Sequence, residues 1–326
     1  MARSRPRDPG GTEPAEQEPQ SESAVTVLVA LVANGLIAAA KTVAAMLTGS
    51  ASMVAESAHS WADTGNEVFL FLATRRASRK PDESHPLGYG RDAYVWSMIA
   101  AFGLFAVGAA VSIMHGVQEL LDPEPSEGFV VAYVVLAISF VLEGVSFAQA
   151  FRQARREAAE REKDLFSFVL HTSDPTVRAV FFEDAAALTG IVIAFLGILG
   201  HQLTGSPVPD AVGSILVGVL LGVVAIVLIQ RNRRFLVGEE VDPVIRSAAL
   251  TTLLSRPAIS AVTYLHIEYA GPSRVFLVAA VDLTGDDSEH DAAVRLGELQ
   301  RDIERNPRVV RAVLTLAAPE HAPLTP

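Results

Sequence analysis

Six apolar segments, each close to the length that crosses a bilayer, decide the class of this chain of 326 residues. They cover residues 25–47, 53–73, 93–117, 129–150, 176–199 and 209–229. A helix needs about 20 mainly apolar residues to span the hydrocarbon core of a membrane. The sequence therefore predicts an all-α membrane bundle of six transmembrane helices within residues 24–237.

The connections between these segments alternate in charge. Lysines and arginines follow the second, fourth and sixth segments, for example Arg75, Arg155 and Arg233, whereas the connections near residues 49, 123 and 205 contain none. Positively charged loops stay on the cytoplasmic side. We therefore predict that both termini are cytoplasmic, and we expect a multi-pass protein of a bacterial inner membrane.

The two ends of the chain differ from the apolar part. Residues 1–23 are rich in proline, glutamate and serine, which predicts a disordered acidic tail. From residue 238 the pattern becomes that of a small α+β domain ending near residue 319, before a short tail at 320–326. Its expected order is helix, strand, strand, helix and strand, at residues 243–254, 259–269, 274–282, 287–306 and 308–316.

Ionisable side chains inside two apolar segments indicate the function. His59 and Asp63 interrupt the second segment one helical turn apart on the same face, and Glu183 and Asp184 interrupt the fifth. Such groups are costly within a membrane and usually mark an ion pathway or a ligand site. An imidazole and several carboxylates can bind a divalent transition metal. A hydrogen bond that only packs helices together is the alternative interpretation.

Other polar residues within the segments have simpler interpretations. Lys41 in the first segment needs a partner, and we favour a structural ion pair with Glu143 of the fourth over a role of Glu143 as a metal ligand. Asn66 lies near the same helix face as Asp63, where it either packs helices or supports the metal ligands.

Five stretches resemble the cation diffusion facilitator family of zinc and manganese exporters. They are SAHSWAD at residues 57–63, the loop at 82–91, and the stretches at 182–190, 210–218 and 236–240. The stretch at 182–190, together with residues 173–177, is similar to the branch that contains the ninth human zinc transporter and its bacterial relatives. The resemblance implies a homodimer that exports divalent metal in exchange for protons, with a transport site between the second and fifth spans. It also implies a ferredoxin-like cytoplasmic domain.

The fifth span departs from the pattern of most zinc-transporting members. These members carry a histidine four residues before an aspartate, and alignment on Gly190 places the aspartate at Asp184 and the histidine at Val180. We therefore predict a metal site of His59, Asp63 and Asp184, with Glu183 as a further ligand or a proton acceptor. Zinc is the expected substrate, with manganese, cobalt and ferrous iron open, and no cofactor is expected.

Two accessory metal sites of the family are not predicted here. Some relatives bind a second ion after the second span with two histidines and an aspartate, but Tyr89 replaces one histidine beside Asp82 and His85. The strands of the C-terminal domain also lack the clustered histidines that some relatives place there. We therefore expect this domain to pair two copies of the chain without tight metal.

Other classes of function fit the sequence less well. The sequence contains no HExxH or GxSxG motif, so an enzyme is not expected. A net charge of −11 without a basic stripe argues against nucleic-acid binding. The remaining alternative is a family member that transports nothing and serves as a partner subunit, because its fifth-span site is altered.

Overall fold

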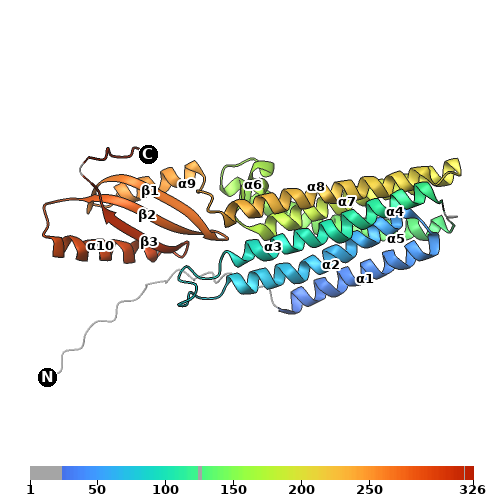
Figure 1. Cartoon of the computed structure of the whole chain (residues 1–326), viewed down its shortest axis with the longest axis horizontal. Coiled ribbons are helices and arrows are strands. Elements are labelled where there is room, and N and C mark those ends of the chain that lie inside the picture. The colour runs from blue at the N-terminus through green and yellow to red at the C-terminus, as the bar shows by residue number, and fades with distance from the viewer. Residues whose placement is uncertain (1–23, 124–126, 319) are drawn as a thin grey trace, which may run out of the picture.

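The computed structural model describes residues 24–123, 127–318 and 320–326. The predicted acidic tail at residues 1–23 lies outside the described residues. A long helical bundle forms one part of the molecule, and a smaller α+β domain continues its long axis at one end (Figure 1).

Six long helical segments occupy the six predicted spans. They are α1 (Ala24–Thr48), α2 (Ala51–Ala77), a third segment made of α3 (Asp92–Gly103), the π-helical turn η1 (Leu104–Ala109) and α4 (Ala110–Leu121), then α5 (Phe129–Glu160), α7 (Pro175–Thr204) and α8 (Val208–Leu236). Five of these segments are long and apolar enough to cross a membrane, and α2 is the exception. The polar groups of α2 are sheltered, because this helix packs against α1, α3, α7 and α8.

The fourth predicted span is longer than expected. Helix α5 continues past residue 150 to Glu160, so its basic continuation belongs to the same helix. A short helix that we did not predict, α6 (Leu165–His171), then packs against α5 and α7. It begins at Asp164, whose carboxylate caps the backbone amide of Ser167.

The C-terminal domain has the predicted order of elements, namely α9 (Pro243–Leu254), β1 (Ile259–Gly271), β2 (Arg274–Leu283), α10 (Glu289–Glu304) and β3 (Val309–Leu316). Strands β1 and β2 form an antiparallel hairpin, and α10 returns the chain so that β3 pairs parallel to β2. Buried Val262 and Leu265 of β1 form one core with Leu250 of α9 and Ile303 of α10. This arrangement confirms the α+β domain expected from the alternating pattern.

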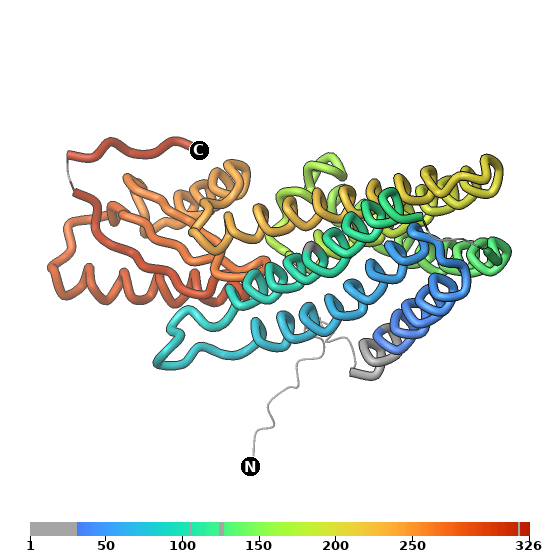
Figure 2. Tube along the Cα trace, turned by 45° about the vertical axis from the view of Figure 1, so that its right-hand side comes forward, coloured from blue at the N-terminus to red at the C-terminus, as the bar shows by residue number. Residues whose placement is uncertain are grey.

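The tip of the β1–β2 hairpin rests on the helical bundle, next to the start of α3 (Figure 2). Two glycines permit the contact: a Cβ atom added at Gly271 would lie 2.6 Å from the Cα atom of Gly90. An ion pair of 2.7 Å joins Arg91, at the start of α3, to Glu268 of β1. The C-terminal domain thus contacts the loop that connects α2 with α3 directly.

Candidate functional site

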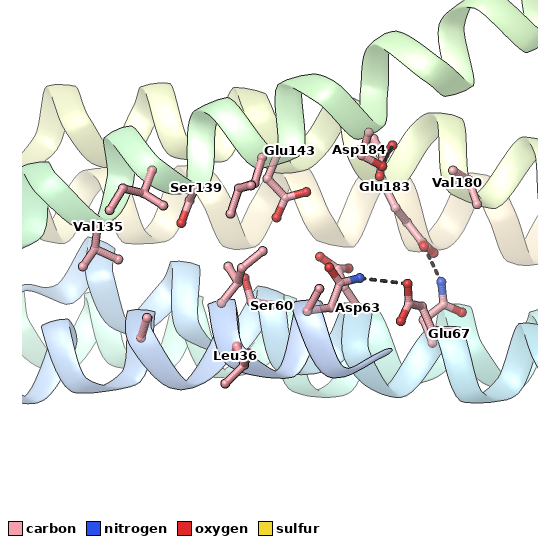
Figure 3. Close-up of a pocket in the computed structure, with 18 of the residues that line it drawn as sticks. Leu36, Ser60, Asp63, Glu67, Val135, Ser139, Glu143, Val180, Glu183 and Asp184 are labelled. Atoms are coloured by element: carbon pink, nitrogen blue, oxygen red, sulfur yellow. Dashed lines mark hydrogen bonds between the residues drawn. The ribbon is translucent and has the colours of Figure 1, made fainter. Parts of the chain in front are cut away.

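A cavity of about 550 Å³ lies between α1, α2, α5 and α7 (Figure 3). Five acidic side chains from three helices line it: Asp63 and Glu67 of α2, Glu143 of α5, and Glu183 and Asp184 of α7. The rest of the wall is mostly apolar, and most of these apolar side chains come from α1 and α5. Carboxylates gathered at membrane depth are costly unless neutralised, so this cavity is a place in the bundle where a cation would be stabilised.

The histidine and aspartate of α2 adjoin each other, as their spacing predicts. His59 is fully buried, and its Nε2 atom lies 3.3 Å from Oδ2 of Asp63. Within the described part of the chain, neither ring nitrogen of His59 nor Oδ1 of Asp63 has a hydrogen-bond partner. A buried polar atom left unsatisfied costs about 1–3 kcal/mol. Binding of a metal at His59 and Asp63 would remove that cost.

The two acids of α7 point to different neighbours. The side-chain amide of Asn66 on α2 donates a hydrogen bond to Glu183, whereas the hydroxyl of Ser146 on α5 donates one of 2.8 Å to Asp184. Adjacent residues of a helix differ by about 100° in direction, which accounts for the divergence. Glu183 therefore faces α2 and Asp184 faces α5, with both side chains at the cavity (Figure 3).

The four predicted site residues lie around or beside the cavity, and their side chains do not converge on one position. Asp63, Glu183 and Asp184 line the cavity, whereas His59 lies behind Asp63 and is not part of the wall. Nowhere in residues 24–123, 127–318 and 320–326 do three histidine, aspartate or glutamate side chains lie close enough to hold one metal ion. For the predicted residues to hold one metal ion together, α2 and α7 would have to bring their acids closer than in this conformation.

The ion pair predicted between Lys41 and Glu143 is wrong. Lys41 of α1 instead pairs with Glu56 of α2 at 2.9 Å, and both side chains are fully buried. The turn between α1 and α2 sets these two helices side by side, and Lys41 and Glu56 lie at similar distances from it along the chain. Gly190 of α7 makes room for the pair, because a Cβ atom there would lie 2.6 Å from Oε1 of Glu56.

Two acids of the cavity are not among the site residues that the sequence predicts. Glu67 lies one turn beyond Asp63 on the same helix face, so its spacing would have indicated it. Its Oε1 atom accepts a hydrogen bond of 2.9 Å from Asn34 of α1. Glu143 carried the signal of an acid within an apolar span, but the expected pairing with Lys41 was preferred to a ligand role.

The loop after α2 is organised by hydrogen bonds around Asp82. The hydroxyl of Tyr89 donates to Oδ2 of Asp82 at 2.6 Å, and the Ser84 hydroxyl donates to Oδ1 at 2.9 Å. These hydrogen bonds, that of Tyr89 first, lower the pKa of Asp82 to about 2. A lowered pKa means that the ionised, hydrogen-bonded form persists as pH falls, until the pH approaches that value. The hydrogen bond from Tyr89 thus engages an oxygen of the Asp82 carboxylate that a metal bound at this loop would need.

We expect Asn66→Ala to lower the free energy of unfolding by about 1–3 kcal/mol, because Glu183 would lose the buried donor that it accepts from. Denaturation of the purified protein in detergent would measure the change. The matched control is Asn34→Ala, which removes the other amide–carboxylate hydrogen bond of the cavity from a less buried position. An equal or larger loss of stability in the control would contradict this ranking.

Comparison with protein families matches the chain to the family described as the cation efflux transmembrane domain, over residues 27–237. The chain belongs to the cation efflux family. This confirms the resemblance drawn from the five stretches, and with it the architecture of a multi-pass membrane bundle followed by a small α+β domain.

Several curated relatives extend this result. The chain is 38% identical over 260 residues to a mitochondrial proton-coupled zinc antiporter of Xenopus laevis, covering 79% of this chain and 46% of that protein. It is 36% identical over 265 residues to metal tolerance protein C4 of Arabidopsis thaliana, covering 81% and 58%. It is 27% identical over 253 residues to a cation-efflux pump of Shewanella oneidensis, covering 77% and 79%. The chain therefore spans about half the length of the zinc antiporters that it matches.

Proposed function

We propose that this chain is a secondary transporter that exchanges divalent cations, zinc first among them, for protons across a membrane. The observation that carries the proposal is the acid-lined cavity between α2 and α7, with His59 set against Asp63. In this proposal His59, Asp63 and Asp184 bind the metal and Glu183 assists as a ligand or a proton acceptor. Manganese, cobalt and ferrous iron are further candidate substrates, because the site is rich in carboxylates.

Exchange for protons follows from the chemistry of the ligands. A carboxylate or imidazole must be deprotonated before it binds a metal, so metal and protons compete for the same atoms. When the metal leaves, the acids of the cavity would remain as costly buried charges unless protons replaced it. Movement of α2 and α7 around the cavity would present it first to one side of the membrane and then to the other.

The direction and location of transport are part of the same proposal. The positive loops support a cytoplasmic C-terminal domain and, with it, export from the cytoplasm as the working direction. We retain a bacterial inner membrane as the expected location, although the name of the Xenopus relative places that protein in mitochondria. The proposal also includes a homodimer, because so small a soluble domain gains stability by pairing.

The test is zinc flux in vesicles that contain the purified protein and an internal pH dye, with the pH gradient imposed, collapsed and reversed. We expect a gradient that drives protons inward to drive zinc outward, and reversal of the gradient to reverse the zinc flux. Zinc flux that is equal in all three conditions would indicate a uniporter. No flux of any divalent metal would leave the non-transporting partner subunit as the function.

The dimer has its own test. The full-length chain in detergent should have a protein mass of about twice 34.7 kDa by light scattering, and should keep it in the presence of a chelator. We expect the chelator to have no effect, because the proposed pairing of the C-terminal domains uses no metal. A monomeric mass would contradict the homodimer, and dissociation by chelator would contradict the metal-free interface.

A further inference from the structure

Glu143 of α5 is an acid of the cavity that the proposed site does not yet use. It lies in the part of α5 that crosses the membrane, and it lines the same cavity as Asp63 and Asp184. The lysine that would have neutralised it, Lys41, forms its ion pair with Glu56 instead. The inference drawn from this position rests on the proposed function.

The position of Glu143 links the acids of α2 to those of α7. Its side chain projects from α5 into the space that Asp63 faces from α2 (Figure 3). Ser146, one turn further along α5, donates its hydrogen bond of 2.8 Å to Asp184. Glu143 therefore lies on the face of α5 that already contacts the proposed ligand Asp184.

Lys41 acts on Glu143 through its charge, but it does not line the cavity and its ion pair is with Glu56. Among the described residues that line the cavity there is no lysine or arginine. Glu183, which is more than nine-tenths buried in the same wall, has no hydrogen-bond partner for its Oε1 atom within the described chain. A charge at this depth needs a partner, and the partner that the cavity can admit is a mobile cation.

We propose that Glu143 contacts the transported cation, so that α5 contributes a third-helix carboxylate to the site formed by α2 and α7. A carboxylate is a hard oxygen ligand. Added to a site that already contains an imidazole, it favours manganese more than it favours zinc. Glu143 would therefore set the metal selectivity of the site as well as its affinity. Its removal should weaken manganese transport more than zinc transport.

The experiment compares wild type, Glu143→Gln and Glu67→Gln in vesicles, with initial rates measured against zinc and manganese concentration. We expect Glu143→Gln to raise KM for manganese about tenfold. The rise in KM for zinc should be clearly smaller, and the maximal rate for either metal should change little. The control Glu67→Gln removes an equal charge from the same cavity, at a carboxylate that Asn34 already engages. It should leave the ratio of the two KM values as in wild type.

A second measurement separates this inference from the proposed function. Equilibrium binding of manganese to the detergent-solubilised full-length chain should weaken about tenfold in Glu143→Gln. Glu143→Asp, which keeps the carboxylate, should recover part of the lost affinity. Binding to Glu143→Asp also provides the test if the glutamine variant does not fold. Wild type that binds but does not transport would overturn the proposed function alone. Unchanged binding in both variants, or an equal change of the KM ratio in Glu67→Gln, would overturn the role of Glu143.

Discussion

Replacing Asp63 with asparagine should reduce zinc flux by about a hundredfold or more while leaving the bundle folded. Asp63 lines the cavity and lies against His59, so it is the residue that connects the imidazole with the acids of α7. Asparagine keeps the size of the side chain but removes the charge and the metal–carboxylate bond. Loss of a group that only supports a metal ligand already costs 10–100-fold, and loss of a ligand should cost at least as much.

Zinc uptake into vesicles and a melting curve of the same preparation would together measure this effect. Ser60→Ala is the matched control, because Ser60 lines the same cavity from the same helix and carries no charge. The control should transport zinc at close to the wild-type rate. Normal flux in Asp63→Asn, with normal folding, would show that the transport site lies elsewhere.

The second large effect concerns stability. Lys41→Met should lower the free energy of unfolding by about 3–5 kcal/mol, because it would leave Glu56 as an uncompensated buried charge. Methionine fills a similar volume, so the loss of stability would come from the unpaired charge of Glu56 and not from an unfilled space at position 41. Chemical denaturation in detergent would measure the effect.

The double variant Lys41→Met with Glu56→Gln tests the cause. Removing both charges should recover most of the lost stability, since a buried ion pair is often no more stable than neutral groups of the same size. A double variant as unstable as Lys41→Met alone would show that Lys41 stabilises the bundle by packing and not by its charge.

The parts of this fold that the sequence predicts are those that depend on neighbouring residues in the chain. The six spans follow from apolar length, and the strands β1, β2 and β3 follow from alternation. The contact between His59 and Asp63 follows from a spacing of four within one helix. Each of these predictions needs only the geometry of a single helix or strand.

The parts that could not be predicted depend on how helices rotate against each other. The sequence places Lys41, Glu56 and Glu143 in three of the predicted spans but does not state which acid faces the lysine. The helical geometry also implies that Glu183 and Asp184 point in different directions. It does not identify Asn66 and Ser146 as the donors of their hydrogen bonds. Whether Asp184 or Glu183 binds the metal therefore stays a prediction, to be decided by substitution of each.

The low apolarity of α2 has a consequence for how the protein is made. A helix with Glu56, His59, Asp63 and Glu67 is a poor substrate for insertion on its own. The ribosome delivers it directly after α1, however, and the two helices are joined by the single turn at residues 49–50. Contacts within this pair, from Lys41 to Glu56 and from Asn34 to Glu67, already satisfy several of its polar groups. We expect α1 and α2 to leave the translocation channel together, and Asp63 to meet the acids of α7 only late in synthesis.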